Sequence, residues 1–253
     1  MINLTDQVVA VTGAGRGIGA AIAHRFAEQG ATVVGLDLGT PENAPEGVQM
    51  LQCDVSDAQQ AQHAVSQIVD LHGRLDVLIN NAGINVIGQV DELDVEQWDQ
   101  AFAVNTRGVF NTCRAAIAPM KEQRYGRIIN AASFAAVVPS VGSAAYAASK
   151  AAVVQMSRVL ASELGPWNIT VNSYAPGMIP GAMNTFSQMS PEAQEETLDS
   201  LSLRRWGQPE EVADVVCFLA SDLARYTTGT MLDVSGGKLA TQRPQDAYRG
   251  MEG

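Results

Sequence analysis

The chain has 253 residues, of which 46% are hydrophobic and 17% charged, and its formal net charge is -11. This length suits one sizeable domain and is short for two, so residues 1–253 are expected to form a single domain. An excess of negative charge repels other polyanions, so neither nucleic acid nor an anionic membrane is an expected partner.

Cysteines, histidines and the N-terminal residues give no sign of secretion or of metal binding. The three cysteines have no CxxC spacing and are expected to be reduced, buried thiols. The three histidines are scattered along two helical patterns, so no metal site is predicted. Residues 1–8 run straight into a strand, which leaves no room for a signal peptide, and no apolar run reaches the length of a membrane span. We therefore expect a cytoplasmic protein.

Strand and helix patterns alternate along the chain. Short apolar runs rich in β-branched residues predict strands, and apolar residues at steps of three and four predict helices. The predicted strands span residues 8–12, 32–37, 48–53, 75–80, 127–133, 169–175 and 231–234, and the predicted helices span about 17–29, 56–72, 95–121, 146–164 and 209–221. This alternation is typical of an α/β fold with a mostly parallel sheet and helices on both faces.

Three segments depart from the alternation. Residues 38–47 are rich in glycine and proline and predict a loop where a crossover helix is usual. Residues 177–205 predict an irregular, partly helical flap over the substrate. The polar tail 238–253 exceeds what the sheet needs, and it is expected either to be disordered or to cover the flap of a neighbouring subunit.

The turn after the first strand has the composition of a dinucleotide site. Residues 12–19 read TGAGRGIG and open the first helix. Glycines here let the backbone approach a pyrophosphate, while the N-terminus of the helix faces it. Asp37 ends the second strand, 18 residues after Gly19, where a carboxylate can hydrogen-bond both ribose hydroxyls of NAD.

Arg16 gives an opposing signal, because an arginine at this turn can pair with the 2'-phosphate of NADP. Asp37 would repel that phosphate, and Leu38 supplies no second basic residue. Losing a hydrogen-bonded diol and adding charge repulsion should cost more than one flexible arginine recovers, so NAD is predicted and NADP is less favoured. Arg16 is equally well explained as a solvated residue at the start of a helix.

A second group of residues has the chemistry of proton transfer. Hydride transfer to or from a carbinol carbon needs a partner for the hydroxyl proton. Tyr146 and Lys150 are four residues apart and share one face of a helix, where the lysine cation can lower the tyrosine pKa from its usual value of about 10. Ser133 ends the fifth strand, where its hydroxyl can hydrogen-bond a substrate oxygen.

Five motifs occur in a fixed order: TGxxxGxG at residues 12–19, Asn80-Asn-Ala-Gly83, Ser133, Tyr146-xxx-Lys150 and Pro176-Gly177. The ordered set resembles the short-chain dehydrogenase/reductase family from about residue 4 to Gly237. The resemblance implies a doubly wound, Rossmann-like fold with seven strands in the order 3-2-1-4-5-6-7. It also implies an NAD-dependent oxidoreductase that interconverts a secondary alcohol and its ketone, with Tyr146 as general acid/base.

The resemblance further implies roles for single residues. Asn105 resembles a fourth catalytic residue, beside Ser133, Tyr146 and Lys150, that supports a water relay to the lysine. Asp54 and Val55 would flank the adenine, Asn81 to Gly83 would line the ribose side, and the backbone of Ile179 would hold the carboxamide. The implied cofactor-binding set is Gly13, Arg16, Gly17, Ile18, Gly19, Asp37, Asp54, Val55, Asn81, Ala82, Gly83, Tyr146, Lys150, Pro176, Gly177 and Ile179.

The flap departs from the family pattern. The family often has PGxxxT after the sixth strand, whereas this chain has Gly181 at the threonine position, with Thr185 as a possible substitute. The apolar residues of the flap, Met178, Met183, Phe186 and Met189, suit either a small hydrophobic or cyclic substrate or the packing of the flap itself.

Two other functions are compatible with the motifs. A 3-oxoacyl-carrier-protein reductase has the same motif order, but Asp37 disfavours NADPH, Trp167 replaces a basic docking residue, and the negative charge suits an acidic carrier poorly. A dinucleotide-sensing binding protein is disfavoured by the intact Ser133, Tyr146 and Lys150. The resemblance also implies a homotetramer, with a dimer as the alternative, formed through the helices at 95–121 and 146–164.

Overall fold

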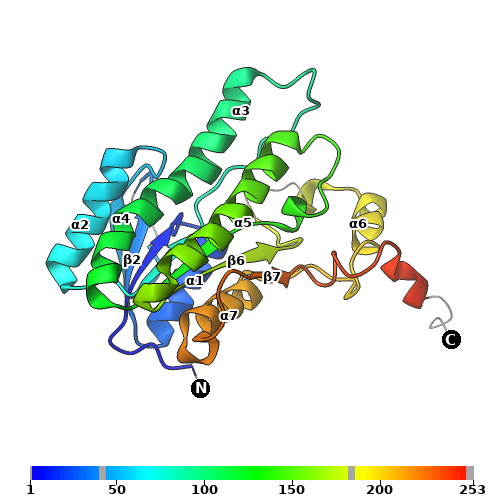
Figure 1. The fold of residues 1–253 in the computed structure, drawn as a ribbon. Helices are drawn as coiled ribbons and strands as arrows, with labels where there is room; N and C mark the ends of the chain where they lie inside the picture. The colour runs from blue at the N-terminus through cyan, green and yellow to red at the C-terminus, as the bar shows by residue number, and fades with distance from the viewer. Residues whose placement is uncertain (1, 40–43, 182–185, 249–253) are drawn as a thin grey trace.

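The centre of the molecule is a seven-stranded sheet (Figure 1). The computed structural model describes residues 2–39, 44–181 and 186–248. The strand order is β3-β2-β1-β4-β5-β6-β7, which confirms the predicted order, and all neighbouring strands pair in parallel. The strands are β1 (Val8–Thr12), β2 (Thr32–Asp37), β3 (Val48–Gln52), β4 (Val77–Asn80), β5 (Gly126–Ala131), β6 (Ile169–Pro176) and β7 (Met231–Val234).

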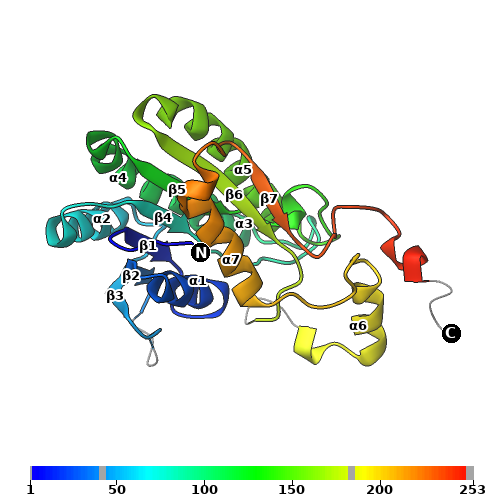
Figure 2. The ribbon, with the colours of Figure 1, turned by 90° about the horizontal axis from the view of Figure 1, so that it is seen from below.

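Helices cover both faces of this sheet (Figures 1 and 2). On one face lie α1 (Gly17–Glu28) and α7 (Pro209–Ala220), and on the other lie α2 (Ala58–His72), α4 (Gly108–Gln123) and α5 (Ala144–Leu164). Each face therefore has its own apolar core. The central strands β1, β4 and β5 are buried along their whole length, as expected of parallel strands covered on both faces.

The helix predicted over residues 95–121 is continuous but not uniform. It begins as α3 (Val95–Phe102), widens into a π-helical turn, η1 (Ala103–Arg107), and resumes as α4. Short π segments are frequent at functional sites, and this one contains Asn105. The other predicted helices and strands begin and end within about two residues of the observed ones.

The flap contains two short helical segments, and the described part of the tail is folded. In the flap, a short turn (η4, Phe186–Gln188) precedes α6 (Pro191–Leu198). The tail ends in a 3-10 helix, η6 (Pro244–Tyr248), which folds back on the flap of its own chain. The Tyr248 hydroxyl donates to the Ser202 carbonyl at 2.7 Å. Neither disorder nor a neighbour's flap is needed to account for residues 238–248.

Three further expectations concern the loop between β2 and β3, membrane spans and metal sites. Between β2 and β3, residues 38–39 and 44–47 form bends and turns, in agreement with the predicted loop. Within the described ranges 2–39, 44–181 and 186–248, no helix is long and apolar enough to cross a membrane. In the same ranges, no group of three or more histidine, cysteine, aspartate or glutamate side chains gathers at a possible metal site.

Candidate active site

The parallel sheet brings the sequence motifs to one side of the molecule. The glycine-rich turn follows β1, Asn81 follows β4, Ser133 follows β5 and Gly177 follows β6. Because parallel strands all end at the same side of a sheet, these four positions converge there. Their convergence explains why residues spread over more than half of the chain can build one site.

Polar side chains fix the turn after β1 against the end of β4. The Thr12 hydroxyl accepts hydrogen bonds from the backbone N–H groups of Asn81 and Ala82, each at 3.0 Å. The Asn81 side-chain amide donates in return to the carbonyls of Thr12 and Gly13 at 3.2 Å. The Asn81 side chain therefore holds the turn itself, which is a different task from lining the ribose.

Two glycines give this turn the shape of an anion cradle. A Cβ at Gly19 would lie 2.0 Å from the Gly13 carbonyl oxygen, so only glycine lets helix α1 begin this close to β1. Gly17 has φ +57°, and a Cβ there would meet no atom of the described residues within 4 Å, so this position faces open space. An open turn at the N-terminus of a helix fits the pyrophosphate of a dinucleotide.

Asp37 lies at the end of β2 with its carboxylate held by the backbone. One oxygen accepts from the N–H of Gly15 and the other from the N–H of Leu38, both at 2.8 Å. A carboxylate fixed at this position repels a phosphate brought to the same place. Arg16, in contrast, is exposed at the start of α1, and its side chain makes no capping hydrogen bond.

The loop after β3 is fixed by a residue that the sequence analysis did not select. The Asn111 side chain, on α4, donates to the carbonyl of Val55 at 2.9 Å. The Asp54 carboxylate accepts from the hydroxyl of Ser56 at 2.7 Å and from its N–H at 2.9 Å. Asn111 and Asp54 together fix the backbone that would flank an adenine. A buried asparagine inside a helix has no local signal that would distinguish it as such an anchor.

Ser133 and Tyr146 lie within hydrogen-bonding reach of each other at the end of β5. Tyr146 is on the first turn of α5, and the hydrogen bond from Ser133 lowers the pKa of the tyrosine. Burial is the larger effect and raises the pKa of Tyr146 above its usual value of 10. The Ser133 hydroxyl also accepts from the N–H of Ala135 at 3.1 Å, which orients the serine.

Lys150 lies one turn further along α5 and is almost fully buried. Its ammonium donates to the Ala131 carbonyl at 2.9 Å and lies 5.9 Å from the centre of the Tyr146 ring. Burial lowers the pKa of Lys150 from 10.5 to about 8. Burial is the largest influence on the pKa of both Tyr146 and Lys150.

Asn105 lies beside the same group, held in the π-helical turn η1. Its side-chain oxygen accepts from the N–H of Ile84 at 2.8 Å, and its amide donates to the Ile84 carbonyl at 2.9 Å and to the Ser149 hydroxyl at 3.0 Å. A Cβ at Gly83 would lie 3.1 Å from the Asn105 oxygen and 3.3 Å from the Lys150 nitrogen. Gly83, which follows β4, therefore lies next to both Asn105 and Lys150.

The loop after β6 closes the other side of the site. The N–H of Gly177 donates to the Val234 carbonyl at 3.1 Å, and the N–H of Ile179 donates to the Gly177 carbonyl at 3.1 Å. Pro176 and Gly177 are partly buried, and the Ile179 side chain is buried. Gly181, the residue at the threonine position, is exposed, and its suggested substitute Thr185 lies outside the described residues, as does Met183.

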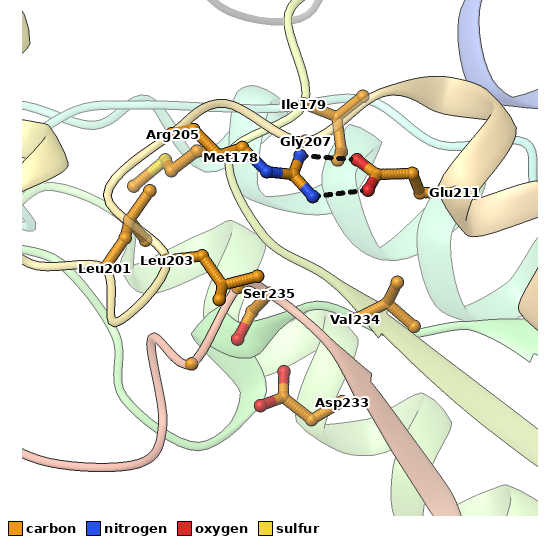
Figure 3. A pocket seen from close by; sticks show the side chains of 12 residues that line it. Met178, Ile179, Leu201, Leu203, Arg205, Gly207, Glu211, Asp233, Val234 and Ser235 are labelled. Atoms are coloured by element: carbon orange, nitrogen blue, oxygen red, sulfur yellow. Dashed lines mark hydrogen bonds and ion pairs between the residues drawn. The ribbon is translucent and has the colours of Figure 1, made fainter.

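A cavity of about 160 Å³ lies behind this loop (Figure 3). Met178 and Ile179 form part of its wall, and the bidentate ion pair between Arg205 and Glu211 lies along one side, with N–O distances of 2.6 and 2.8 Å. Ser133, Tyr146 and Lys150 do not line it. The cavity is therefore distinct from the group formed by Ser133, Tyr146 and Lys150.

Two further side chains near the site were not foreseen. Tyr174, on β6, is fully buried and donates through its hydroxyl to the Asn81 side-chain oxygen at 3.1 Å. Ser149 accepts from Asn105 and donates to the Tyr146 carbonyl at 2.7 Å, so it links the π-helical turn to α5. Both lie in patterns that are read as ordinary strand and helix, and only the fold shows their partners.

Comparison with known proteins identifies the class. A family model described as enoyl-(acyl carrier protein) reductase matches residues 13–238. The 3-oxoacyl-[acyl-carrier-protein] reductase of Thermotoga maritima is 38% identical over 245 residues, covering 93% of this chain and 99% of that protein. The protein of the same name from Staphylococcus aureus (strain N315) is 38% identical over 237 residues, covering 90% of this chain and 96% of the relative.

Solved structures agree with these sequence matches. Levodione reductase superposes with a TM-score of 0.88 at 34% identity, covering 94% of this chain and 99% of that one. The aldohexose dehydrogenase of Thermoplasma acidophilum superposes with a TM-score of 0.87 at 32% identity, covering 94% and 96%. A parallel sheet with a glycine-rich first turn defines a dinucleotide-binding oxidoreductase fold. This chain belongs to the short-chain dehydrogenase/reductase family.

Proposed function

We propose that the protein is an NAD-dependent oxidoreductase that interconverts a secondary alcohol and its ketone, with a small hydrophobic or cyclic substrate. The observation that carries the proposal is the convergence of Ser133, Tyr146 and Lys150 at the ends of β4 and β5, beside the open turn at Gly17. A bound nicotinamide would supply or accept the hydride, and the protein would supply the proton.

Each residue of this group has a separate task in the proposed reaction. The Tyr146 hydroxyl gives its proton to the substrate oxygen in reduction and takes it back in oxidation. Ser133 hydrogen-bonds the same oxygen and orients it. The Lys150 ammonium, fixed by the Ala131 carbonyl, would give a proton to the tyrosinate left after reduction and take one from water. Asn105 holds the backbone around Gly83 in position. Because burial raises the pKa of Tyr146, the residue keeps its proton at neutral pH, the form that donates to a ketone.

The cofactor assignment rests on Asp37. Its carboxylate, fixed by the N–H groups of Gly15 and Leu38, supports NAD over NADP because it would hydrogen-bond a ribose diol and repel a 2'-phosphate. The remaining cofactor contacts proposed are the turn from Gly13 to Gly19, the segments at Asp54–Val55 and Asn81–Gly83, and the loop from Pro176 to Ile179.

A 3-oxoacyl-carrier-protein reductase is the second candidate, and the relatives from Thermotoga maritima and Staphylococcus aureus favour it. Two features of this chain favour a free small molecule as the substrate. Trp167 is packed under the ammonium of Lys121, 3.9 Å from the ring centre, so an aromatic side chain occupies the position of a basic docking residue. The net charge of -11 also repels an acidic carrier protein.

The test is a substrate panel with both cofactors. Cyclic alcohols, aryl ketones and a 3-oxoacyl thioester are each mixed with the enzyme and NAD(H) or NADP(H), and the absorbance of the reduced nicotinamide is followed. We expect turnover of the cyclic or aryl compounds with NAD(H), and loss of at least about 1000-fold in kcat in Tyr146→Phe with NADH binding retained, because general acid–base catalysis supplies such factors.

The other outcomes separate the alternatives. Turnover of the thioester with NADPH, faster than of any free ketone, would assign the carrier-protein reductase instead. Tight NADH binding without turnover of any compound would favour a dinucleotide sensor. Loss of NADH binding in Tyr146→Phe would contradict the role assigned to the hydroxyl.

We further propose that the protein assembles with copies of itself, as a homotetramer or, alternatively, a dimer, in the cytoplasm. Phe110 on α4 and Val159 on α5 support this proposal, because both are large apolar side chains that are about half exposed (49% and 56%) on the helices expected to meet.

A further inference from the structure

Lys238 carries a partly buried positive charge near the reacting groups. Its ammonium lies 5.9 Å from the centre of the Phe134 ring, and Phe134 is the residue directly after Ser133. The lysine follows β7, whose end is tied to the loop after β6 by the hydrogen bond from Gly177 to the Val234 carbonyl. Lys238 therefore lies near the side chain of the residue after Ser133, on a segment that follows the strand bonded to the proposed nicotinamide loop.

The backbone that carries Lys238 is held at several points. The N–H of Lys238 donates to the Ser235 hydroxyl at 3.0 Å, and the Ser202 hydroxyl donates to the Gly237 carbonyl at 3.1 Å. The N–H of Leu203 donates to the Gly236 carbonyl at 3.0 Å. These bonds join the segment to the flap, so the position of the lysine is set by the fold and not by a free tail.

No carboxylate among the described residues pairs with the charge of Lys238. The described ranges 2–39, 44–181 and 186–248 contain no carboxylate within 4 Å of its ammonium, although six arginines in those ranges form such pairs. Burial lowers the pKa of Lys238, which shows that the charged form is disfavoured by lost water. The ring of Phe134 lies at the outer limit of a cation–π contact and returns little of this cost.

The cofactor does not account for this charge. The pyrophosphate cradle follows β1, and any 2'-phosphate would lie by Asp37 at the end of β2. In the strand order β3-β2-β1-β4-β5-β6-β7, Lys238 lies beyond the opposite end, after β7. An anion that meets Lys238 must come from the substrate side of the site.

We propose that Lys238 determines specificity by binding a carboxylate of the substrate, so that the enzyme acts on a hydroxy acid or keto acid whose ring or chain lies along Phe134. This inference rests on the function proposed above. A single ammonium matches a single negative charge, and a carboxylate carries one charge where a phosphate ester carries up to two. A bound carboxylate would return to the lysine the hydrogen bonds that burial removes.

The test compares two ligands that differ only in charge: a cyclohexanone bearing a carboxylate and the same ring bearing a carboxamide. Binding is measured by calorimetry to the complex of NADH with Tyr146→Phe, which does not require turnover, and kcat/KM is measured in parallel with the wild-type enzyme. We expect the carboxylate to bind about 10- to 100-fold more tightly than the carboxamide, the range of one charged hydrogen-bonded contact.

Variants assign the effect to the lysine. Combining Lys238→Met with Tyr146→Phe should remove the preference for the carboxylate and leave the binding of the carboxamide and of NADH unchanged. Combining Lys238→Arg with Tyr146→Phe should keep most of the preference. Lys121→Met is the matched control, because Lys121 also lies over an aromatic ring, that of Trp167, but far along α4 from the site. It should leave both ligands unaffected.

The two proposals fail in different ways. Equal binding of carboxylate and carboxamide, or a preference that survives Lys238→Met, would overturn the role of Lys238. A ring phosphate ester that binds more tightly than the carboxylate would overturn the assignment to carboxylates. Carboxylate binding that depends on Lys238, without turnover of either ketone, would support the lysine contact and count against the proposed reaction.

Discussion

At the scale of one residue, burial of the Lys150 ammonium lowers the free energy of unfolding. Its side chain is 3% exposed, and burial lowers its pKa from 10.5 to about 8. Each unit of pKa shift is worth about 1.4 kcal/mol, so the buried ammonium costs about 3 kcal/mol at neutral pH. The hydrogen bond to the Ala131 carbonyl returns about 1 kcal/mol of it.

We therefore predict that Lys150→Met makes the protein more stable at pH 7, by about 1–2 kcal/mol, while abolishing turnover. Because the folded pKa lies below the unfolded one, the unfolded wild-type chain binds more protons between about pH 8 and 10.5, and the wild-type stability rises with pH in that window. Urea unfolding at pH 7 and pH 9.5 should show the advantage of the variant shrinking as the pH rises. A variant that is less stable at pH 7 would contradict this cost.

The sequence was enough to select candidate catalytic residues, but it did not give the hydrogen-bond partners of the residues around them. The spacing of Tyr146, Lys150 and Ser133 places a proton-transfer group in the sequence without any structure. Asn81 was expected to line a ribose, yet its side chain holds the carbonyls of Thr12 and Gly13. Whether a side-chain amide binds a ligand or the backbone depends on how two loops are placed relative to each other. The order of residues in the sequence does not give that placement.

At the scale of elements, the π-helical turn η1 is the feature that apolar spacing could not show. One additional residue in a helical turn leaves the apolar pattern of residues 95–121 almost unchanged. Its effect is local: it directs Asn105 toward the backbone of Ile84. The strands were easier to predict, because continuous β-branched runs such as that of β1 occur where both faces of a sheet are covered.

Asn105→Ala should therefore lower both stability and cofactor binding. Removing the side chain leaves the N–H and C=O of Ile84 without their partners, which costs about 2–4 kcal/mol in urea unfolding and loosens the segment at Gly83. We expect NADH, followed by fluorescence titration, to bind several-fold more weakly.

The matched control is Asn172→Ala. Asn172 is a buried asparagine on β6 that bonds the backbone of Thr227 and Thr230 in the same two ways. It should lower stability by a similar amount and leave NADH affinity unchanged. Equal NADH affinity in both variants would show that Asn105 serves the fold alone.

At the scale of the whole molecule, the C-terminal tail is bound to the flap. The flap follows β6 and the tail follows β7, and the hydrogen bond from Tyr248 to the Ser202 carbonyl connects them, with the Arg204 guanidinium 6.0 Å from the tyrosine ring. The same Arg204 pairs with Glu195 and Asp199 at 2.7 and 2.9 Å. The polar composition of the tail left disorder and contact with a neighbouring subunit as alternatives, because composition does not record such contacts.

Removing residues 240–253 should thus raise KM for the ketone by roughly three- to tenfold, with kcat changed less, because the loss of about 1 kcal/mol of hydrogen bonding loosens the flap. Steady-state kinetics of the truncated enzyme measure both constants. A chain that ends at Tyr248 is the control and should match the full-length protein. If the chain that lacks residues 240–253 has the same KM as the full-length protein, the tail does not support the flap.

The strand order described first has a consequence for changing this enzyme. Asp37 ends β2 and Lys238 follows β7, five inter-strand spacings apart, which is about 24 Å at the usual distance between strands. Sites that far apart with no shared partner contribute independently to the free energy. Cofactor preference and acid recognition can therefore be selected in separate libraries and recombined, and the combined variant should show the sum of the two effects.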